Sequence, residues 1–445
     1  MKRIYKPWEK RFKKIATPFE HFLHAQTTTG IVLMLMTMFA LILANSSFYE
    51  MYLHFFHTEI DLTVGSWKLS HSIHHWINDG LMAIFFFIIG LEIKREVMVG
   101  ELSNIKVAIL PIFAAVGGML LPALIFTLVN YSSEGAAGWG IPMATDIAFA
   151  ISALILLGNR VSPALVTFLV ALAIVDDLGA VIVIAIFYTD QIQFLPLILA
   201  GISFVLMVVL NLSGIRVILP YFIVGLFMWF FMLESGVHAT IAGVIAALAI
   251  PSNPKRAPED FVDYTKDLLD RYDSYPSCDD YVLHQKQKAI LLNIQDSIDS
   301  VQSPAAKLEH YLHLPIALII IPLFALANAG IAIDFSSISS TIQTPVSLGI
   351  MAGLILGKVI GIFGVSYLAI KMDIAKLPEG SSMSQLFGVS FLGGIGFTMS
   401  IFVADLAYAG DDELIFQAKV GILAASFFAG IVGYLWLRFV AKRKG

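Results

Sequence analysis

Charge and cysteine are both scarce in this 445-residue sequence. Asp, Glu, Lys and Arg make up only 14% of it, whereas 58% is hydrophobic and the mean hydropathy is +0.81. Soluble domains carry about 25% charged residues, so this composition indicates an integral membrane protein. The single cysteine, Cys278, excludes a disulfide framework within the chain and any metal site built from several cysteines. No nucleic-acid partner is predicted, because the basic residues form short clusters at segment ends and no broad face.

Long apolar runs are what the sequence has in quantity. A spanning helix needs about 20 mostly apolar residues. The runs that approach this criterion lie near residues 27–46, 79–93, 105–129, 137–158, 163–187, 193–211, 216–233, 237–250, 313–330, 346–370, 385–407 and 414–438. The predicted fold class is therefore an all-α membrane protein with about twelve transmembrane helices, eight within 27–250 and four within 313–440. The stretch 1–26 is longer than a usual signal-peptide n-region, so no cleavage is expected.

The distribution of Lys and Arg between the runs predicts the orientation. Connections on one side carry Lys94 and Arg95, Arg160, Arg216, and Lys371 and Lys376. The alternate connections "NYSSEGAAG", "YTDQIQ" and "DFSSISSTIQT" have neither residue, and Lys68 alone departs from the pattern. Both termini, 1–26 and 441–445, are basic and are therefore expected to be cytoplasmic.

Two connections are long enough to fold on their own. Residues 47–78 contain "EIDLTVGSWKLS", whose alternation around Val64-Gly65 predicts an extracytoplasmic β-hairpin. A lone hairpin is marginally stable and would need a partner surface. Residues 251–312 begin with several prolines and are expected to form a solvated cytoplasmic loop. Its second half has apolar residues at helical spacing, which predicts one amphipathic helix.

Four ionisable residues lie deep inside apolar runs: Asp146, Asp176, Asp177 and Lys358. Such side chains cost several kcal/mol in a membrane unless they are paired or hydrated, so they are candidates for function. Adjacent helical positions point about 100° apart, so one of Asp176 and Asp177 can face a cavity while the other meets a neighbouring helix. Their repulsion suits the pair to exchange a proton near physiological pH. Lys358 needs a counter-ion, which we expect to be an aspartate on another helix.

Two of the apolar runs contain helix breakers. Gly140 and Pro142 precede Asp146 in "GWGIPMATDIAFA", and Gly393, Gly394 and Gly396 interrupt "FLGGIGFTMSIF". These runs take matching places in two groups of three, runs three to five and ten to twelve. Broken segments in corresponding positions predict an inverted-repeat transporter with its site at the midplane. Other acids are expected to be structural: Asp79 as a helix cap, and Asp405 as a hydrated run end.

The motifs of this chain resemble those of the NhaA family of Na+/H+ antiporters, a known example of inverted-repeat transporters. They are "GLEIKRE" at 90–96, "ATDIAFA" at 144–150, "AIVDDLGAV" at 173–181, "SGVHATIAGV" at 235–244, "GK" at 357–358 and "GIGFTMSIF" at 394–402. The likeness runs from about residue 19 to 440. The segment 252–312 and the extended basic N-terminus depart from it.

The resemblance implies an electrogenic, pH-regulated exchange of Na+ or Li+ for H+ by alternating access in the bacterial inner membrane, with no cofactor and no catalysis. By resemblance, Asp177 and Asp176 bind the cation and carry protons, and Lys358 pairs with Asp176. Further positions carried over by resemblance are Thr145 and Asp146 beside the site, and Glu92 and His238 in the pH response. The hairpin within 47–78 matches one that joins a homodimer.

Two alternatives remain on the residues alone. Asp146 and Asp176 lie on separate runs and could form the dyad of an intramembrane aspartyl protease. Such an enzyme would have no use for Lys358, and the paired breaks would go unexplained. An ion channel is the other alternative, but a buried titratable site in about twelve spans favours alternating access.

Overall fold

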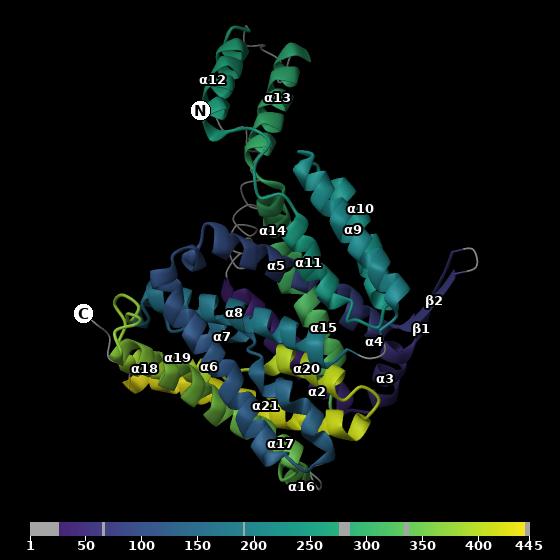
Figure 1. The fold of residues 1–445 in the computed structure, drawn as a ribbon, viewed down its shortest axis with the longest axis vertical. Helices are drawn as coiled ribbons and strands as arrows, with labels where there is room; N and C mark the ends of the chain where they lie inside the picture. The colour runs from purple at the N-terminus through teal and green to yellow at the C-terminus, as the bar shows by residue number, and fades with distance from the viewer. Residues whose placement is uncertain (1–25, 65–66, 190–191, 276–284, 333–337, 441–445) are drawn as a thin grey trace, which may run out of the picture.

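The computed structural model describes residues 26–64, 67–189, 192–275, 285–332 and 338–440, so both terminal basic stretches, 1–25 and 441–445, lie outside the described residues. The described chain is mostly helical, and its only sheet is a two-stranded hairpin. Figure 1 shows a packed body of helices from which two features project: the hairpin β1–β2 and a pair of helices, α12 and α13.

The N-terminal part of the described chain is a succession of helices, two pairs of which are bent at a short break. Its elements are α2 (Gln26–Ala44), α3 (Tyr49–His57), α4 (Ile73–His75), η1 (Trp76–Leu81), α5 (Met82–Met98), η2 (Glu101–Ser103), α6 (Ile105–Val129), η3 (Glu134–Met143), α7 (Ile147–Ile155), η4 (Gly158–Arg160), α8 (Pro163–Phe187), α9 (Phe194–Leu212), α10 (Ile218–Glu234) and α11 (Thr240–Ala249). The run α4–η1–α5 forms one span, Ile73–Met98.

The C-terminal half begins outside the helical body with α12 (Pro258–Asp273) and α13 (Gln285–Val301). It continues with α14 (Pro304–Pro315), η5 (Ile316–Ile320), α15 (Ile321–Asn328), α16 (Ile338–Ile342), α17 (Pro345–Ala352), η6 (Gly353–Gly357), η7 (Ile360–Gly364), α18 (Val365–Lys371), α19 (Met383–Leu392), α20 (Phe397–Ala407), α21 (Asp412–Leu435) and η8 (Trp436–Val440). The elements α14–η5–α15 form one span, Pro304–Asn328, and α17 to α18 form another, Pro345–Lys371.

The helices are long and apolar enough to cross a membrane. Seven of those described pass by themselves, and up to ten pass if each bent pair is one span; α10 and α11 are shorter apolar helices. Large apolar side chains cover the outside, such as Leu128 at 69% exposed and Phe427 at 73%, while Asp176 and Lys358 are buried inside. An apolar surface around a partly polar interior suits a lipid environment. The chain is therefore an all-α membrane protein with a small sheet.

Two spans begin earlier than the apolar runs predict. The second starts at Ile73 and not near 79, and the ninth starts at Pro304 and not near 313. Ser72 and Ser303 cap these earlier starts, since their hydroxyls accept hydrogen bonds from the backbone N–H groups of His75 and Ala306, both at 3.2 Å. Polar residues such as His74, Lys307 and Glu309 are mixed into both early stretches, so a hydropathy window misses them.

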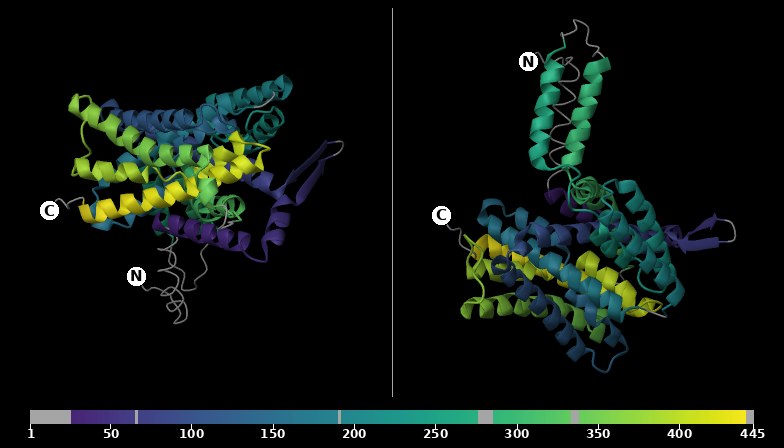
Figure 2. Two further views of the ribbon diagram at one scale, coloured as in Figure 1. Left: turned by 90° about the horizontal axis from the view of Figure 1, so that it is seen from below. Right: turned by 45° about the horizontal axis from the view of Figure 1, so that its top comes forward.

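The predicted hairpin is present as an antiparallel pair. Strand β1 (Glu59–Val64) pairs with β2 (Trp67–Ser72) in the register Glu59 to Ser72 through Val64 to Trp67, and residues 65–66 of the turn lie outside the described residues. The pair extends beyond the helices in both views of Figure 2. The N–H group of Ile73 donates to the carbonyl oxygen of Thr58 at 3.0 Å, so the two ends of the hairpin meet at the body.

The segment 251–312 holds two helices before the next span, where the sequence predicted one. Besides α13, the structure has α12, and the two pack side by side as an arm that stands away from the body (Figure 2, right). Leu268 of α12 and Ile290 of α13 are 3% and 8% exposed and lie in this contact. Helix α12 was missed because six of its sixteen residues are acidic, which conceals its apolar face.

Candidate functional site

Two helices of the body are interrupted near their middles. Helices η3 and α7 meet at a bend of 41°, and α19 and α20 meet at 45°. The residues between the helices are 144–146 and 393–396, and neither stretch is assigned to a helix. At Gly394 a Cβ would lie 2.4 Å from the carbonyl oxygen of Leu354, so only glycine permits this close backbone approach. The breaks predicted from Pro142 and the glycines are therefore where the sequence places them.

The two interruptions cross and hydrogen-bond to each other. The N–H group of Asp146 donates to the carbonyl oxygen of Ile395 at 2.6 Å, and the hydroxyl of Thr145 donates to the carbonyl oxygen of Gly393 at 2.8 Å. In the other direction, the hydroxyl of Ser400 donates to the carbonyl oxygen of Ile141 at 2.9 Å. The backbone groups that unwinding frees are thus satisfied inside the protein, as a membrane interior requires.

Asp146 joins the starts of both half-helices that follow the breaks. Its Oδ1 accepts from the N–H group of Phe149 in α7 at 3.0 Å. Its Oδ2 accepts from the N–H group of Thr398 in α20 at 3.1 Å and also from the hydroxyl of Thr398. Helix N-termini carry partial positive charge, so one carboxylate between two of them is stabilised by both. Asp146 thus holds the crossing together.

Lys358 lies against this crossing from a third span. Its Nζ donates to Oδ2 of Asp176 at 2.6 Å and to the hydroxyl of Thr145 at 2.9 Å. The lysine is 0% exposed, and the pair has no access to solvent. The counter-ion expected on another helix is therefore Asp176 of α8. One cation links α8, the break before α7 and the span Pro345–Lys371.

Asp177 is the carboxylate that this arrangement leaves unsatisfied. It is 2% exposed, and its Oδ1 has no hydrogen-bond partner among the described residues. The Oδ1 of Asp176 is likewise buried without a partner in the described part of the chain. Buried oxygens without partners cost a large desolvation penalty unless a proton or a cation binds them. Among the described residues Lys358 is bonded to Asp176 and not to Asp177, so the two adjacent carboxylates can accept a further positive charge.

A cavity is lined in part by the N-terminal half of α8, the helix that carries this pair. Its volume is about 510 Å³, and its lining includes Glu96, Glu101, Thr167 and Ala171. Ala171 precedes Asp176 by five residues, about 8 Å along the helix axis. Two carboxylate-bearing side chains at the rim favour the entry of cations. The cavity therefore offers a cation a route to within about two helical turns of the aspartates.

Comparison with known proteins gives one consistent match. The family model described as Na+/H+ antiporter 1 matches residues 20–437. A protein of Sulfurimonas denitrificans named Na(+)/H(+) antiporter NhaA is 69% identical over 440 residues, which is 99% of each chain. Relatives with the same kind of name from Saccharophagus degradans and Dichelobacter nodosus are 48% and 46% identical over 98% of this chain and 94% of their own.

The chain belongs to the Na+/H+ antiporter 1 family. Its members are transporters, so the chain is not an enzyme, and transport by the family requires no cofactor. The protease alternative fails on this membership. It also conflicts with the site, because Asp146 is held by Thr398 and Phe149 while Asp176 is held by Lys358.

Glu92 and His238, the two positions that the family resemblance linked to pH, lie far from each other. Glu92 is on α5 one turn before Arg95 and Glu96, which form an ion pair at 2.9 Å. Arg95 also pairs with Glu309 of α14. His238 instead donates from Nε2 to the carbonyl oxygen of Tyr188, at 2.6 Å, at the C-terminal end of α8. The structure thus places the two at opposite ends of the bundle.

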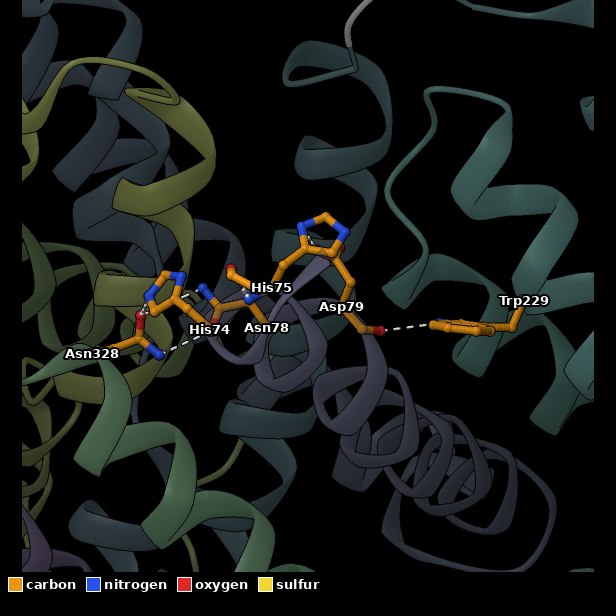
Figure 3. Close-up of polar contacts among 7 residues, drawn as sticks. His74, His75, Asn78, Asp79, Trp229 and Asn328 are labelled. Carbon is orange, nitrogen blue, oxygen red and sulfur yellow. Dashed lines mark hydrogen bonds and ion pairs between the residues drawn. The ribbon is translucent and has the colours of Figure 1, made fainter. Parts of the chain in front are cut away.

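Asp79 is not the helix cap that its position suggested. The helix starts at Ile73, and Asp79 lies inside it, where Oδ2 is 3.2 Å from Nδ1 of His75 and the backbone carbonyl accepts from Nε1 of Trp229 at 3.0 Å. Figure 3 shows these contacts beside a second polar group on the same helix. There, Asn328 of α15 accepts from His74 Nε2 at 2.9 Å and donates to Asn78 at 2.9 Å. This polar group joins α15 to the start of the second span.

Sequence reasoning missed two polar contacts. Thr398 was quoted in a motif but given no role, although its position directly after a broken helix could have suggested one. Asp405, expected to be hydrated, is 3.1 Å from Nζ of Lys419 on α21, and the two side chains are only 11% and 14% exposed. The signal for this pair was Lys419 within the apolar stretch "FQAKVGIL". No group of three or more His, Cys, Asp and Glu in the described chain is arranged to hold a metal ion.

Proposed function

We propose that this protein exchanges intracellular Na+ or Li+ for external protons across the bacterial inner membrane. The observation that carries the proposal is the buried pair Asp176 and Asp177, which has two unsatisfied oxygens and one bonded cation. The names of the relatives, all Na+/H+ antiporters, agree with this chemistry. Carboxylate oxygens suit a hard cation and also bind protons, so one site can serve both.

Asp177 binds the cation first in this mechanism, with Asp176 as its neighbour. Lys358 balances one of the two negative charges, and the bound Na+ or Li+ balances the other. When the cation departs, a proton must take its place, because two ionised carboxylates in a low dielectric repel each other. If more protons than cations move, the exchange is electrogenic. Each net charge then responds to voltage by about 2.3 kcal/mol per 100 mV.

Alternating access is assigned to the crossing of the broken helices. We assign α6 to α8 and α17 to α21 to two inverted repeats among twelve spans. In support, α6 packs along the span Pro345–Lys371. Thr145 and Asp146 bind the opposite break, so a movement of either half-helix changes the surroundings of Lys358 and Asp176. Lys358, Thr145 and Asp146 therefore position the site and couple it to the movement.

The apparent affinity for Na+ should rise with pH, because Na+ and protons compete for the same oxygens. Simple linkage gives up to about tenfold per pH unit for each proton that the cation displaces. The increase must level off at the pH where the free site holds no proton. Isothermal titration calorimetry at several pH values, in buffers of different ionisation enthalpy, measures both the affinity and the number of protons released.

Buffers matched in ionic strength with choline chloride serve as the control, since the methyl groups of choline prevent carboxylate oxygens from coordinating its charge as they coordinate Na+. An affinity that does not change with pH, together with no proton release, would contradict the shared site. That result would favour a sodium channel, in which cation flux needs no proton gradient.

The pH response is assigned to Glu92 at one end of the bundle and His238 at the other. Glu92 stands beside the Arg95, Glu96 and Glu309 charges near the entry cavity. His238 holds the last turn of the aspartate-bearing helix through Tyr188. We place both termini and the arm in the cytoplasm and the hairpin on the opposite side, in accord with the distribution of basic residues.

The hairpin β1–β2 is proposed to join two copies of the chain. It has only two strands, so both outer edges are open for pairing, and Ile60 is 42% exposed. Deleting residues 59–70 should yield monomers that still transport, because Thr58 and Ile73 already lie at hydrogen-bond distance and Ser72 remains to cap α4. Light scattering in detergent measures the mass, and a deletion variant that stays dimeric would show that the principal contact is elsewhere.

A further inference from the structure

The outer face of α12 carries a stripe of carboxylates. Asp260, Asp263, Asp267 and Asp270 follow the spacing i, i+3, i+7 and i+10, which places them on one side of the helix. All four are exposed, while Leu268 on the other side is buried against α13. We call these four residues the acidic stripe. With Glu259 and Asp273, α12 has six acidic residues against Lys266 and Arg271, a net charge of −4.

The acidic stripe has almost no counter-charge within the described chain. Only Asp267 has an ion-pair partner there, Arg271 one turn later at 2.8 Å. Like charges three or four residues apart destabilise a helix, so the stripe is stabilised by a cationic partner.

The arm holds this stripe in a fixed place. At its base, the N–H groups of Lys255 and Arg256 both donate to the carbonyl oxygen of Ser300 at 3.0 Å, and the guanidinium of Arg256 lies 4.1 Å from the ring centre of Tyr264. These contacts tie the entry to α12 to the end of α13. The carboxylates therefore stand together on a supported surface.

The chain has two basic termini outside the described residues, and the longer one, residues 1–25, carries more basic residues than 441–445. It has seven basic residues against two acidic ones, a net side-chain charge of +5: Lys2, Arg3, Lys6, Lys10, Arg11, Lys13 and Lys14 against Glu9 and Glu20. Such a segment complements the stripe in charge and needs only a short path to reach it.

The described structure begins at Gln26, directly after this segment, and places Gln26 on the same side as the arm. Helix α2 packs against η5 and α15, and at its C-terminal end Asn45 Nδ2 donates to the carbonyl oxygen of Ile331, just after α15, at 2.8 Å. Because these C-terminal ends meet, α2 and the span Pro304–Asn328 run parallel, so Gln26 lies toward α14, which directly follows the arm. A stretch of 25 residues reaches up to about 80 Å, whereas α12 is about 24 Å long.

We propose that the acidic stripe of α12 is the docking surface for the basic segment 1–25 of the same chain. Tethering gives the segment an effective concentration near the millimolar range, so weak exposed ion pairs suffice to hold it. Anionic lipid headgroups are the competing surface for a basic segment. The stripe is favoured because it combines four close carboxylates with a tethered partner. The contact is separate from the ion site and does not depend on the proposed exchange.

Pulsed electron paramagnetic resonance on the full chain in lipid nanodiscs tests the contact. Spin labels are placed at Ala16→Cys and Ser274→Cys in a Cys278→Ser background, because Ser274 is exposed and continues the stripe beyond Asp270. We expect a population of short distances. The substitutions Asp260→Asn, Asp263→Asn and Asp270→Asn together should lower the ratio of docked to undocked chains by about three- to thirty-fold.

The matched control removes the same charge from the arm but not from the face of the stripe: Asp273→Asn, Asp296→Asn and Asp299→Asn. It should change the ratio by less than about twofold. Raising the salt to 1 M, where the Debye length is about 3 Å, should undock the unaltered chain, so the proposal stays testable even if a variant fails to fold.

Four results would overturn the proposal. One is the absence of short distances in the unaltered chain, and another is an equal loss in both triple variants. A short distance that disappears on dilution with unlabelled chains would assign the contact to two copies. A distance population that follows the anionic lipid content, and not the stripe substitutions, would assign the segment to the membrane surface.

Discussion

Asp177→Asn should reduce sodium-driven proton movement to the background of protein-free vesicles. The amide keeps the size and shape of the side chain but loses the negative charge that binds Na+ and the oxygen that takes up a proton. Folding should survive, because Asp177 Oδ1 has no described partner to lose and a buried charge is removed. Reconstituted vesicles with an internal pH-sensitive dye measure the exchange, and a thermal unfolding curve in detergent checks that the variant is folded.

Asp373→Asn provides a matched control for this experiment. Asp373 is an exposed residue between α18 and α19, and its φ of 57° is one that asparagine adopts readily. The control therefore removes an equal charge without strain and should keep the exchange of the unaltered protein. Exchange at the unaltered level in Asp177→Asn would refute the assignment of the cation site.

The residues that carry the site could be found from the sequence because each violates the chemistry of its surroundings. Exposing a carboxylate or a lysine to lipid costs several kcal/mol. This free energy alone predicts that the two aspartates and Lys358 are buried, and that Lys358 pairs with an aspartate on another helix. The breaks near Pro142 and Gly394 followed from residues that cannot continue a helix or that permit close approach. Such arguments need no knowledge of which helices are neighbours.

The connections between those residues could not be predicted, because they depend on helices that are distant in the sequence. Asp146 and Thr398 are 252 positions apart, and only the crossing of two broken helices makes one carboxylate cap both. The expectation for Asp405 was wrong for the same reason, since a charge at the end of an apolar run is hydrated only if no other helix covers it. The expectation that Asp79 caps a helix was wrong because the helix starts earlier, at Ile73. Helix α12 was missed because its acidic face conceals the small apolar face that packs on α13.

Removal of either Lys358 or Asp176 alone should cost about 3–5 kcal/mol of unfolding free energy, because the remaining charge stays buried without its partner. The variants Lys358→Met and Asp176→Asn keep most of the side-chain volume, so cavity formation adds little. Lys358 would still donate to Thr145 in Asp176→Asn, at the 2.9 Å contact of the intact site. That contact is to a neutral hydroxyl, so it cannot replace a carboxylate as counter-charge.

The double variant should lose clearly less than the sum of the two single losses, since it leaves neither charge unpaired. Unfolding in mixed micelles with increasing SDS gives the free energies for this cycle. The pair Asp405 and Lys419 serves as a reference, studied as Asp405→Asn, Lys419→Met and both: its side chains are 11% and 14% exposed, whereas Asp176 and Lys358 are at 0%. Partial hydration should make its coupling weaker. Additive losses at Lys358 and Asp176 would show that the two charges do not depend on each other, and the lysine would then have to be stabilised by Thr145 and the ends of the broken helices.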